Sequence, residues 1–230
     1  MSQPRPRVEL RRVRHGLELR IDGTQASVYR PGGGVTGVVW WALASPVLLL
    51  PPSRRRRVLV LGLAAGSVAR AVRALDPGAE IVGVERDGEV LRLARRHFGL
   101  DRLRLEVVVG DALDYLRRER RLFDIVVEDL FVGPSRSVRK PAWLLGEGYR
   151  LIRRRLRRGG LVVSNTIHET ADVVRVMRPS GGRVVTLDVR GHWNAIAVCG
   201  RDLPAPRDIR RALVPTAARR ILRQVTLRSR

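Results

Sequence analysis

One stretch limits what this chain can fold into: an apolar run that ends in a glycine turn and continues as a helix. The run is Val58 to Leu61, the turn spans Gly62 to Gly66, and the helical pattern covers about Ser67 to Leu75. Such an apolar run is typical of a strand buried on both faces, as in a parallel sheet. The glycines permit a tight turn and close approach of a ligand, and the helix directs its N-terminal amides at that turn. The stretch predicts a strand–turn–helix unit with a ligand site at its turn.

A second strand that ends in an acid gives this site a chemical character. The apolar segment Ile81 to Val84 is followed directly by Glu85. A carboxylate at the end of the second strand can accept hydrogen bonds from both hydroxyls of a ribose. The sequence therefore indicates a nucleoside-containing cofactor that lies across the carboxyl ends of a parallel sheet. The alternative is a turn that serves packing alone.

Strands and helices alternate after residue 57, which predicts an α/β fold with a mostly parallel sheet. Strands are expected over 58–62, 81–85, 104–109, 123–128 and 161–165, and helices over 67–75, 88–98, 112–118, 141–157 and 168–178. The pair Gly159-Gly160 is expected to cap the helix over 141–157. The segments 183–189 and 194–199 flank a turn, so we expect them to form an antiparallel pair at the C-terminal edge of the sheet.

The chain divides into four predicted regions. Residues 1–7 form a basic lead that we expect to be disordered, and residues 8–50 form a small antiparallel β-unit followed by an apolar helix. Residues 51–200 are the predicted cofactor-binding domain. Residues 201–230 form a tail with a basic helix over about 207–225.

The charge of the chain bears on its partners. The formal net charge is +23, from 45 basic and 22 acidic residues, and Lys140 is the only lysine. Such an excess is compatible with a polyanionic partner such as nucleic acid, or with a solvated basic surface that has no specific partner.

Other features exclude several classes of protein. Cys199 is the only cysteine, so an intramolecular disulfide and a cysteine zinc cluster are excluded, and with four scattered histidines we expect no metal site. The N-terminus lacks the apolar core of a signal peptide. The apolar window from Val35 to Leu50 is short for a membrane span and is interrupted by Gly37 and Pro46. We therefore expect a cytoplasmic protein without a membrane span.

Six motifs occur in an order that resembles a known family. They are Ile21-Asp22-Gly23-Thr24-Gln25, Arg57 to Gly62, Val84-Glu85-Arg86-Asp87, Gly110-Asp111-Ala112, Phe123 to Asp129 and Arg158-Gly159-Gly160. With these motifs the chain resembles class I S-adenosylmethionine-dependent methyltransferases over about residues 17–200. Within that group it looks most like the spermidine synthase family and its methyltransferase-like relatives. The resemblance implies a Rossmann-like sheet preceded by the small β-unit, and S-adenosylmethionine or its decarboxylated form as cofactor.

The resemblance also implies roles for particular residues. Glu85 would bind the ribose hydroxyls, Asp111 would accept from the adenine amino group, and Asp129 would stand beside the transferring sulfonium as the candidate catalytic residue. The other implied cofactor-binding residues are Gly62, Leu63, Ala64, Gly66, Arg86, Ala112 and Gln25. Asn165, His168 and Glu128 are lesser candidates near strand ends. Asp111 also fits a helix N-cap, and Gln25 fits an ordinary exposed strand residue.

Departures from the family pattern decide which reaction we expect. Ala65 stands where polyamine synthases carry an acid in the glycine turn, and Val132 stands where they carry a second aspartate after the fourth strand. Those acids hold a cationic amine and help to take a proton from its nitrogen. We therefore expect a methyltransferase with an unknown small-molecule or other acceptor.

Three alternatives remain open. A polyamine aminopropyltransferase is favoured by Asp129 and by the β-unit. A non-catalytic protein that binds the cofactor or nucleic acid is favoured by the arginine-rich tail. A nicotinamide-dependent dehydrogenase would need a G-x-G-x-x-G pattern, which the turn lacks. A homodimer is an expectation by family analogy only.

Overall fold

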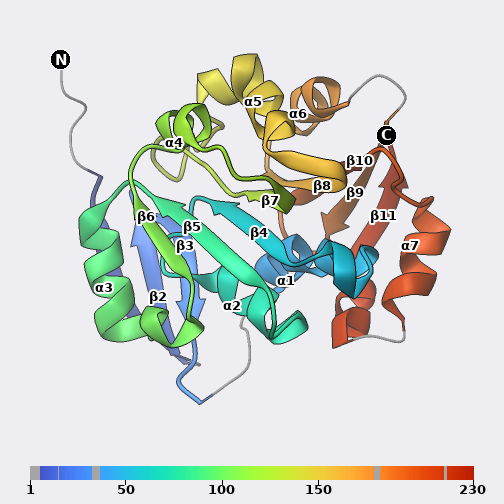
Figure 1. The fold of residues 1–230 in the computed structure, drawn as a ribbon. Coiled ribbons are helices and arrows are strands. Elements are labelled where there is room, and N and C mark those ends of the chain that lie inside the picture. The colour runs from blue at the N-terminus through green and yellow to red at the C-terminus, as the bar shows by residue number, and fades with distance from the viewer. Residues whose placement is uncertain (1–5, 15, 33–36, 179–181, 215–216) are drawn as a thin grey trace.

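The computed structural model describes residues 6–14, 16–32, 37–178, 182–214 and 217–230. An eight-stranded sheet with the order β11-β9-β10-β8-β7-β4-β5-β6 forms the centre of the molecule, and helices cover both of its faces (Figure 1). A separate three-stranded antiparallel sheet precedes it in the chain. The predicted α/β class, with its small N-terminal β-unit, is confirmed.

The elements have the following bounds. The small sheet consists of β1 (Val8–Val13), β2 (Gly16–Ile21) and β3 (Thr24–Tyr29). The large sheet consists of β4 (Arg57–Leu61), β5 (Glu80–Glu85), β6 (Glu106–Val109), β7 (Phe123–Glu128), β8 (Leu156–Thr166), β9 (Arg183–Val189), β10 (Ala195–Gly200) and β11 (Val225–Ser229). The α-helices are α1 (Val38–Ala44), α2 (Ser67–Leu75), α3 (Gly88–Phe98), α4 (Ala112–Arg118), α5 (Tyr149–Arg154), α6 (Thr170–Met177) and α7 (Pro206–Leu213).

The strand order creates a crevice at the middle of the large sheet. β4 pairs in parallel with β5 on one side and with β7 on the other. The chain first builds outward from β4 through β5 to β6, and then returns to add β7 and β8 on the opposite side. Loops that follow β4 and β7 therefore diverge at the carboxyl ends of these strands, where ligands bind in open α/β sheets.

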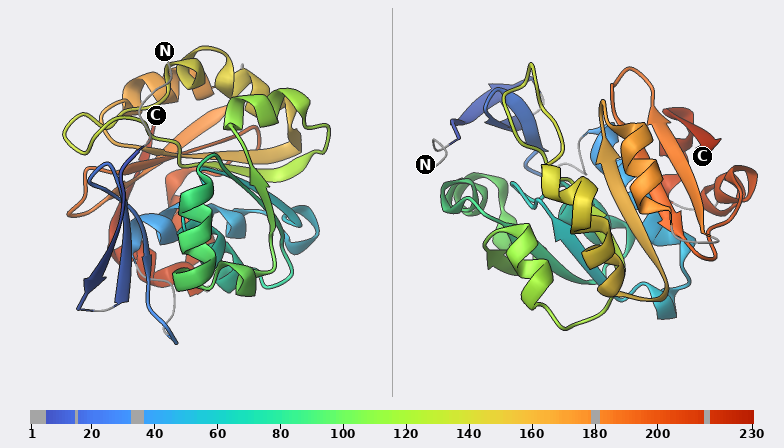
Figure 2. Two further views of the ribbon diagram at one scale, coloured as in Figure 1. Left: turned by 90° about the vertical axis from the view of Figure 1, so that its left-hand side faces the viewer. Right: turned by 90° about the horizontal axis from the view of Figure 1, so that it is seen from above.

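Each central strand serves two hydrophobic cores. Val58 and Val60 of β4 contribute to the core that contains α1, α2, α3 and α7, whereas Leu59 and Leu61 contribute to the core under α4, α5 and α6. All four side chains are buried. Because side chains alternate along a strand, a strand covered on both faces is apolar throughout, as the sequence indicated. Figure 2 shows the helix layers on the two faces of the sheet.

The small sheet is attached to the glycine turn of the large one. The backbone N–H of Ala65 donates to Ser27 Oγ at 3.0 Å, and the N–H of Val28 donates to Ser67 Oγ at 3.2 Å. The Tyr29 ring lies 6.0 Å from that of Phe98 on α3. β3 is thus held against the segment that begins α2. The helix α1, by contrast, packs within the main core against α2 and β9.

The long helix expected over 141–157 is helical over residues 142–154, but it contains a π-helical segment and ends three residues early. A π-turn over Leu144–Gly148 leads into α5, which ends at Arg154, and residues 156–160 already belong to β8. The pair Gly159-Gly160 lies in an irregularity of the β7–β8 pairing and does not cap a helix. A Cβ atom at Gly160 would lie 2.7 Å from the backbone oxygen of Asp124, so the neighbouring strand requires glycine there.

The C-terminal tail also differs from the prediction. The basic helix expected over 207–225 is divided into α7 and a 3-10 segment, Ala217–Arg223, and the chain then forms β11. β11 pairs antiparallel with β9, so the expected edge pair β9–β10 has a third antiparallel strand beside it. Val225 is buried opposite Val189, and this contact favours a strand over a helix at this point.

Two predicted segments near the beginning of the chain and before β6 differ from the structure in where they begin. Of the lead that we expected to be disordered, residues 1–5 lie outside the described residues, while the N–H of Arg7 donates to the Asp22 carboxylate. The strand expected from 104 begins at Glu106, after Arg104 in a left-handed conformation. Within the described ranges, no helix combines the length and the apolarity that crossing a membrane requires.

Candidate active site

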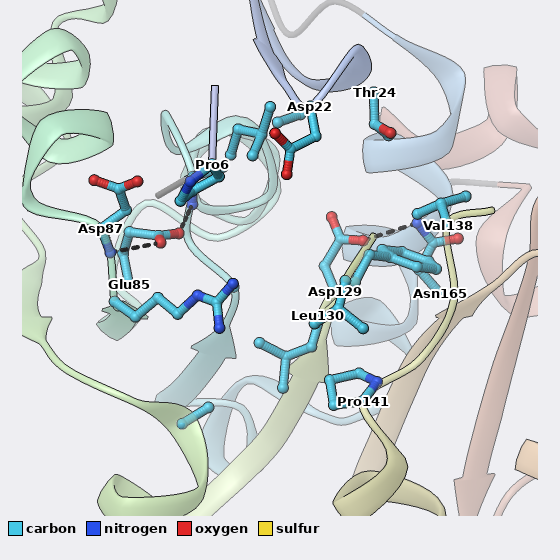
Figure 3. Close-up of a pocket in the computed structure, with 18 of the residues that line it drawn as sticks. Pro6, Asp22, Thr24, Glu85, Asp87, Asp129, Leu130, Val138, Pro141 and Asn165 are labelled. Atoms are coloured by element: carbon cyan, nitrogen blue, oxygen red, sulfur yellow. Dashed lines mark hydrogen bonds between the residues drawn. The ribbon is translucent and has the colours of Figure 1, made fainter. Parts of the chain in front are cut away.

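A cavity of about 360 Å³ lies at the carboxyl ends of β4, β5, β6 and β7, and the β2–β3 turn contributes to its wall (Figure 3). Most of the predicted site residues line it: Gly62, Ala64, Glu85, Arg86, Asp111, Ala112, Asp129, Gln25 and Asn165. Residues far apart in the sequence therefore meet at the crevice that the strand order creates.

The glycine turn fixes the carboxylate of Glu85. The N–H of Ala64 donates to Glu85 Oε2 at 2.9 Å, and the N–H of Asp87 donates to Oε1 at 3.0 Å. Burial raises the pKa of the Glu85 carboxyl above its ordinary value, while these N–H groups act in the opposite direction. Both oxygens are oriented before any ligand binds, and each retains a lone pair for a hydroxyl group.

The amides of the turn have partners inside the protein. The N–H groups of Gly62 and Leu63 donate to the carbonyl of Val84, and that of Gly66 donates to Leu63. The N–H of Ala65 donates to Ser27, as noted above. With the N–H of Ala64, which donates to Glu85, all five amides of the turn are therefore engaged within the protein. A phosphate group would find these donors already engaged.

Two predicted cofactor residues lie outside the cavity lining. Leu63 is buried, and its side chain packs where a Cβ atom at Gly83 would lie. Gly66 has a left-handed backbone at the start of α2, and a Cβ atom there would lie 2.8 Å from the Leu100 side chain. The structure gives both residues a packing role in the turn.

Asp111 both caps a helix and lines the cavity. Its Oδ1 accepts from the N–H of Leu113 at 2.8 Å and from that of Asp114 at 3.4 Å, so it caps α4. Its side chain also belongs to the cavity lining, next to Gly110 and Ala112. The N-cap expected as an alternative is present, and the second oxygen of the carboxylate makes no hydrogen bond to the described part of the chain.

Asp129 follows β7 and reaches the cavity at its centre. Its Oδ1 accepts from Asn165 Nδ2 at 2.8 Å, and Asn165 Oδ1 in turn accepts from Asn194 Nδ2 at 2.9 Å. Burial raises the pKa of the Asp129 carboxyl, and the Asn165 hydrogen bond and the Lys140 charge oppose this shift. The carboxylate is open to the cavity but otherwise surrounded by protein. Such a group is suited to accept a proton from a bound nucleophile.

Glu128, a lesser candidate, lies beneath the cavity and does not line it. Its Oε1 accepts from Lys140 Nζ at 2.7 Å, and both side chains are fully buried. The hydroxyl groups of Tyr149 and Ser164 also donate to Glu128. Lys140 Nζ additionally donates to the carbonyl of Leu130 and lies 4.0 Å from the centre of the Phe131 ring. The pair holds the start of the loop that follows β7. His168 also lies outside the lining.

Several cavity residues escaped the sequence analysis. Asp22 and Thr24 come from the β2–β3 turn, and His192 and Asn194 come from the β9–β10 hairpin. The implied role of Gln25 pointed to the first segment as part of the site, but the sequence gave no sign that the β9–β10 hairpin projects over the carboxyl ends of the parallel strands.

The charge of the cavity is opposite to that of the chain. Five carboxylates and one guanidinium occur in its described lining, and the carboxylates belong to Asp22, Glu85, Asp87, Asp111 and Asp129. The guanidinium belongs to Arg86. The whole chain carries a formal net charge of +23. An acidic cavity in a basic protein favours a cationic ligand.

Replacing Gly62 with alanine tests how closely the turn approaches β7. Gly62 has φ +84°, and a Cβ atom would lie 2.6 Å from the backbone oxygen of Asp129. We expect a loss of at least about 1–3 kcal/mol in the free energy of unfolding, measured by denaturant titration. Gly110→Ala is the matched control, because a Cβ atom there meets nothing within 4 Å. Equal stability of the two variants would contradict the close approach.

Comparison with known proteins adds to this geometry. Residues 43–196 match the model of the spermine/spermidine synthase domain. A polyamine aminopropyltransferase from Synechococcus sp. (strain JA-2-3B'a(2-13)) is 33% identical over 138 residues. That alignment covers 54% of this chain and 43% of the relative, so the chain spans less than half of the relative's length.

Solved structures are similar in fold at lower identity. A protein described as a probable spermidine synthase from Corynebacterium glutamicum has a TM-score of 0.74 at 20% identity, over 97% of this chain and 88% of that one. Human methyltransferase-like protein 13 has a TM-score of 0.61 at 22% identity, over 81% of this chain and 90% of that one. With the family model matching about two thirds of its residues, this chain belongs to the spermine/spermidine synthase domain family.

Proposed function

We propose that this protein transfers an aminopropyl group from decarboxylated S-adenosylmethionine to an amine. The observation that carries the proposal is the acidic lining of the cavity in a strongly basic chain. Both reactants of such a transfer are cations, a sulfonium and an ammonium. A dinucleotide would instead bring two phosphates to a lining with a single described guanidinium and a turn whose amides are engaged.

The residues at the ends of β5 and β6 suit the adenosyl half of this donor. Glu85 presents two oriented oxygens to a ribose, and Asp111 retains an oxygen for the adenine amino group. Because Gly62 has no side chain, the turn comes close to Asp129. The sulfur of the donor would therefore lie between the turn and that carboxylate. When bound, the donor supplies a carbon that is activated by its sulfonium.

Asp129 and its neighbours carry the remaining chemistry. The reacting ammonium first loses one proton, which frees the lone pair of its nitrogen, and Asp129 is placed to accept this proton because Asn165 fixes Oδ1 and burial favours the protonated form. The amine nitrogen then forms a bond to the activated carbon as the carbon–sulfur bond breaks. The electron pair of that bond goes to sulfur, and the product nitrogen is an ammonium. The main contribution of the protein is to align the nitrogen with the carbon–sulfur bond.

Methyl transfer, which the sequence alone favoured, becomes the second candidate. Leu130, Phe131 and Val132 give the cavity an apolar part where polyamine synthases have a second aspartate. The similarity to human methyltransferase-like protein 13 agrees with this candidate in fold. The sequence identity to relatives that are named polyamine aminopropyltransferases, together with the acidic lining, supports the first candidate more strongly.

Product analysis separates the two candidates. The purified protein is incubated with a linear diamine and, in separate reactions, with decarboxylated or intact S-adenosylmethionine. Aminopropyl transfer releases methylthioadenosine and a lengthened amine, whereas methyl transfer releases S-adenosylhomocysteine. Formation of methylthioadenosine only in the presence of amine is the expected result. S-adenosylhomocysteine as the only amine-dependent product would reverse the order of the candidates.

Asp111→Ser tests the adenine role separately from the N-cap role. Serine caps helices about as well as aspartate, so we expect the stability to change by no more than about 0.5 kcal/mol. We expect the dissociation constant of methylthioadenosine to rise about tenfold in calorimetry, because a hydrogen bond to a charged group is lost. Wild-type affinity in Asp111→Ser would restrict Asp111 to capping α4.

A further inference from the structure

We infer that Asp22 is the second substrate carboxylate of this cavity and binds the far ammonium group of a diamine, in place of the acid that is missing at Val132. The inference rests on the proposed aminopropyl transfer, because it assigns the acceptor of that reaction two positive charges. Asp129 would lie beside the reacting nitrogen, and Asp22 would hold the other end of the molecule.

The β2–β3 turn places Asp22 over the cavity. Asp22 and Gly23 form the turn with φ values of +49° and +80°. Figure 3 shows the Asp22 and Asp129 carboxylates on different walls, both turned toward the cavity. A linear diamine between them would have one charged end at each wall and its methylene groups along the apolar residues Leu130 and Val132.

Asp22 is held in this position through one oxygen and its backbone. Its Oδ1 accepts from the N–H of Arg7 at 2.8 Å, and its own N–H donates to the carbonyl of Arg7 at 2.9 Å. Its carbonyl accepts from the N–H of Ser135 at 3.1 Å. The second carboxylate oxygen makes no hydrogen bond to the described part of the chain. One oxygen is therefore anchored and the other is available to a ligand.

The arginines around Asp22 are engaged elsewhere. Arg20 pairs with Glu18 and donates to the carbonyl of Gly23, and the Arg7 guanidinium pairs with Glu9. No ion pair to Asp22 occurs among the described residues, although the chain has 45 basic residues. An unpaired carboxylate that faces a cavity in such a chain is suited to bind a cation from outside the protein.

The loop after β7 connects the Asp22 turn to the position of the missing acid. Ser135 of this loop binds the Asp22 carbonyl, and the loop is closed by a bridge between Val132 and Arg139. The turn and the loop thus form one wall of the cavity. A carboxylate on the turn can therefore contact a ligand in the part of the cavity that Val132 also lines. Thr24 belongs to the same lining, and its buried Oγ1 has no partner in the described chain.

Asp22→Asn removes the charge and keeps the structure. Asparagine tolerates a left-handed backbone, and its Oδ1 can still accept from the N–H of Arg7. The probes are linear diamines with three to five carbons, titrated by calorimetry into protein saturated with methylthioadenosine. We expect the dissociation constant of the best diamine to rise about 10- to 100-fold, as for a lost hydrogen bond to a charged group. The affinity for methylthioadenosine should stay unchanged, as it should in the control Glu9→Gln.

A second variant places an aspartate at position 132 and completes the test. The double variant Asp22→Asn/Val132→Asp should regain most of the diamine affinity, which a purely structural role of Asp22 would not allow. Wild-type diamine affinity in Asp22→Asn, or an equal loss of methylthioadenosine affinity, would overturn the inference. If wild type binds diamines through Asp22 but releases no methylthioadenosine, the inference stands and aminopropyl transfer fails. If wild type binds no diamine, both fail.

Discussion

Replacing Lys140 with methionine is expected to lower the free energy of unfolding by about 3–5 kcal/mol, because Glu128 would become a buried charge without its partner. The two side chains are fully buried and joined by a 2.7 Å contact. Methionine fills a similar volume, so the effect reports the lost charge and not a cavity. Denaturant titration measures it, and Arg92→Met, which removes an exposed pair with Glu89, should change stability by less than about 1 kcal/mol.

A double variant separates the charge from the packing. Lys140→Met/Glu128→Gln removes both charges but keeps an acceptor for the Tyr149 and Ser164 hydroxyl groups. We expect it to be more stable than Lys140→Met alone. Equal instability of the two variants would mean that the shape of Lys140 matters and its pairing does not. Lys140, the one lysine in a chain with 44 arginines, places a compact ammonium at this buried site.

Replacing Asp129 with asparagine is expected to lower the turnover number by about 10²- to 10⁴-fold, the usual contribution of a positioned proton acceptor. The asparagine carbonyl can still accept from Asn165, so the binding of methylthioadenosine should change only slightly. Steady-state kinetics with decarboxylated S-adenosylmethionine and calorimetry measure the two effects. Asp172→Asn, on the exposed face of α6, is the control. Undiminished turnover would remove Asp129 from the chemistry.

The same variant should change how stability depends on pH. Burial raises the pKa of Asp129, so the folded protein binds this proton more tightly than the unfolded chain does. The stability that this group contributes is fully present below the unfolded pKa of about 3.9 and is lost as the pH rises through the folded pKa. Wild type should therefore lose stability relative to Asp129→Asn across that window. Denaturant titrations at several pH values test this, and parallel profiles would contradict it.

Local sequence was sufficient for much of the fold. The helices α2, α3 and α4 have the expected bounds, because their apolar periodicity and their N-terminal residues lie within the segments themselves. Asp87 and Asp111 cap α3 and α4 through hydrogen bonds to amides two residues ahead. Glu85 and Asp129 could be placed for a similar reason, since an acid that directly follows a buried strand must lie at its carboxyl end.

Partners that are distant in the sequence account for the elements that local reasoning missed. Val225-Thr226-Leu227-Arg228 alternates as a strand does, but the arginines before it continue a helical pattern, and only pairing with β9 decides between the two. The pair Gly159-Gly160 resembles a helix C-cap, and only the carbonyl of Asp124 in β7 reveals the reason for it. Asp22 belongs to the Ile21–Gln25 motif of the family, but it was given no role in the site, because Asp-Gly is sufficient to explain a hairpin turn.

The acidic cavity inside a basic surface affects how quickly a substrate binds as well as whether it binds. A cationic substrate is repelled at long range by the surface and attracted only near the carboxylates. Dissolved salt at about 0.15 M screens charges over roughly 8 Å, and it screens exposed arginines more than groups enclosed in a cavity. Moderate ionic strength should therefore accelerate the association of the substrate while leaving its dissociation almost unchanged. Most electrostatically steered enzymes show the opposite dependence, because salt weakens the attraction that guides their substrates.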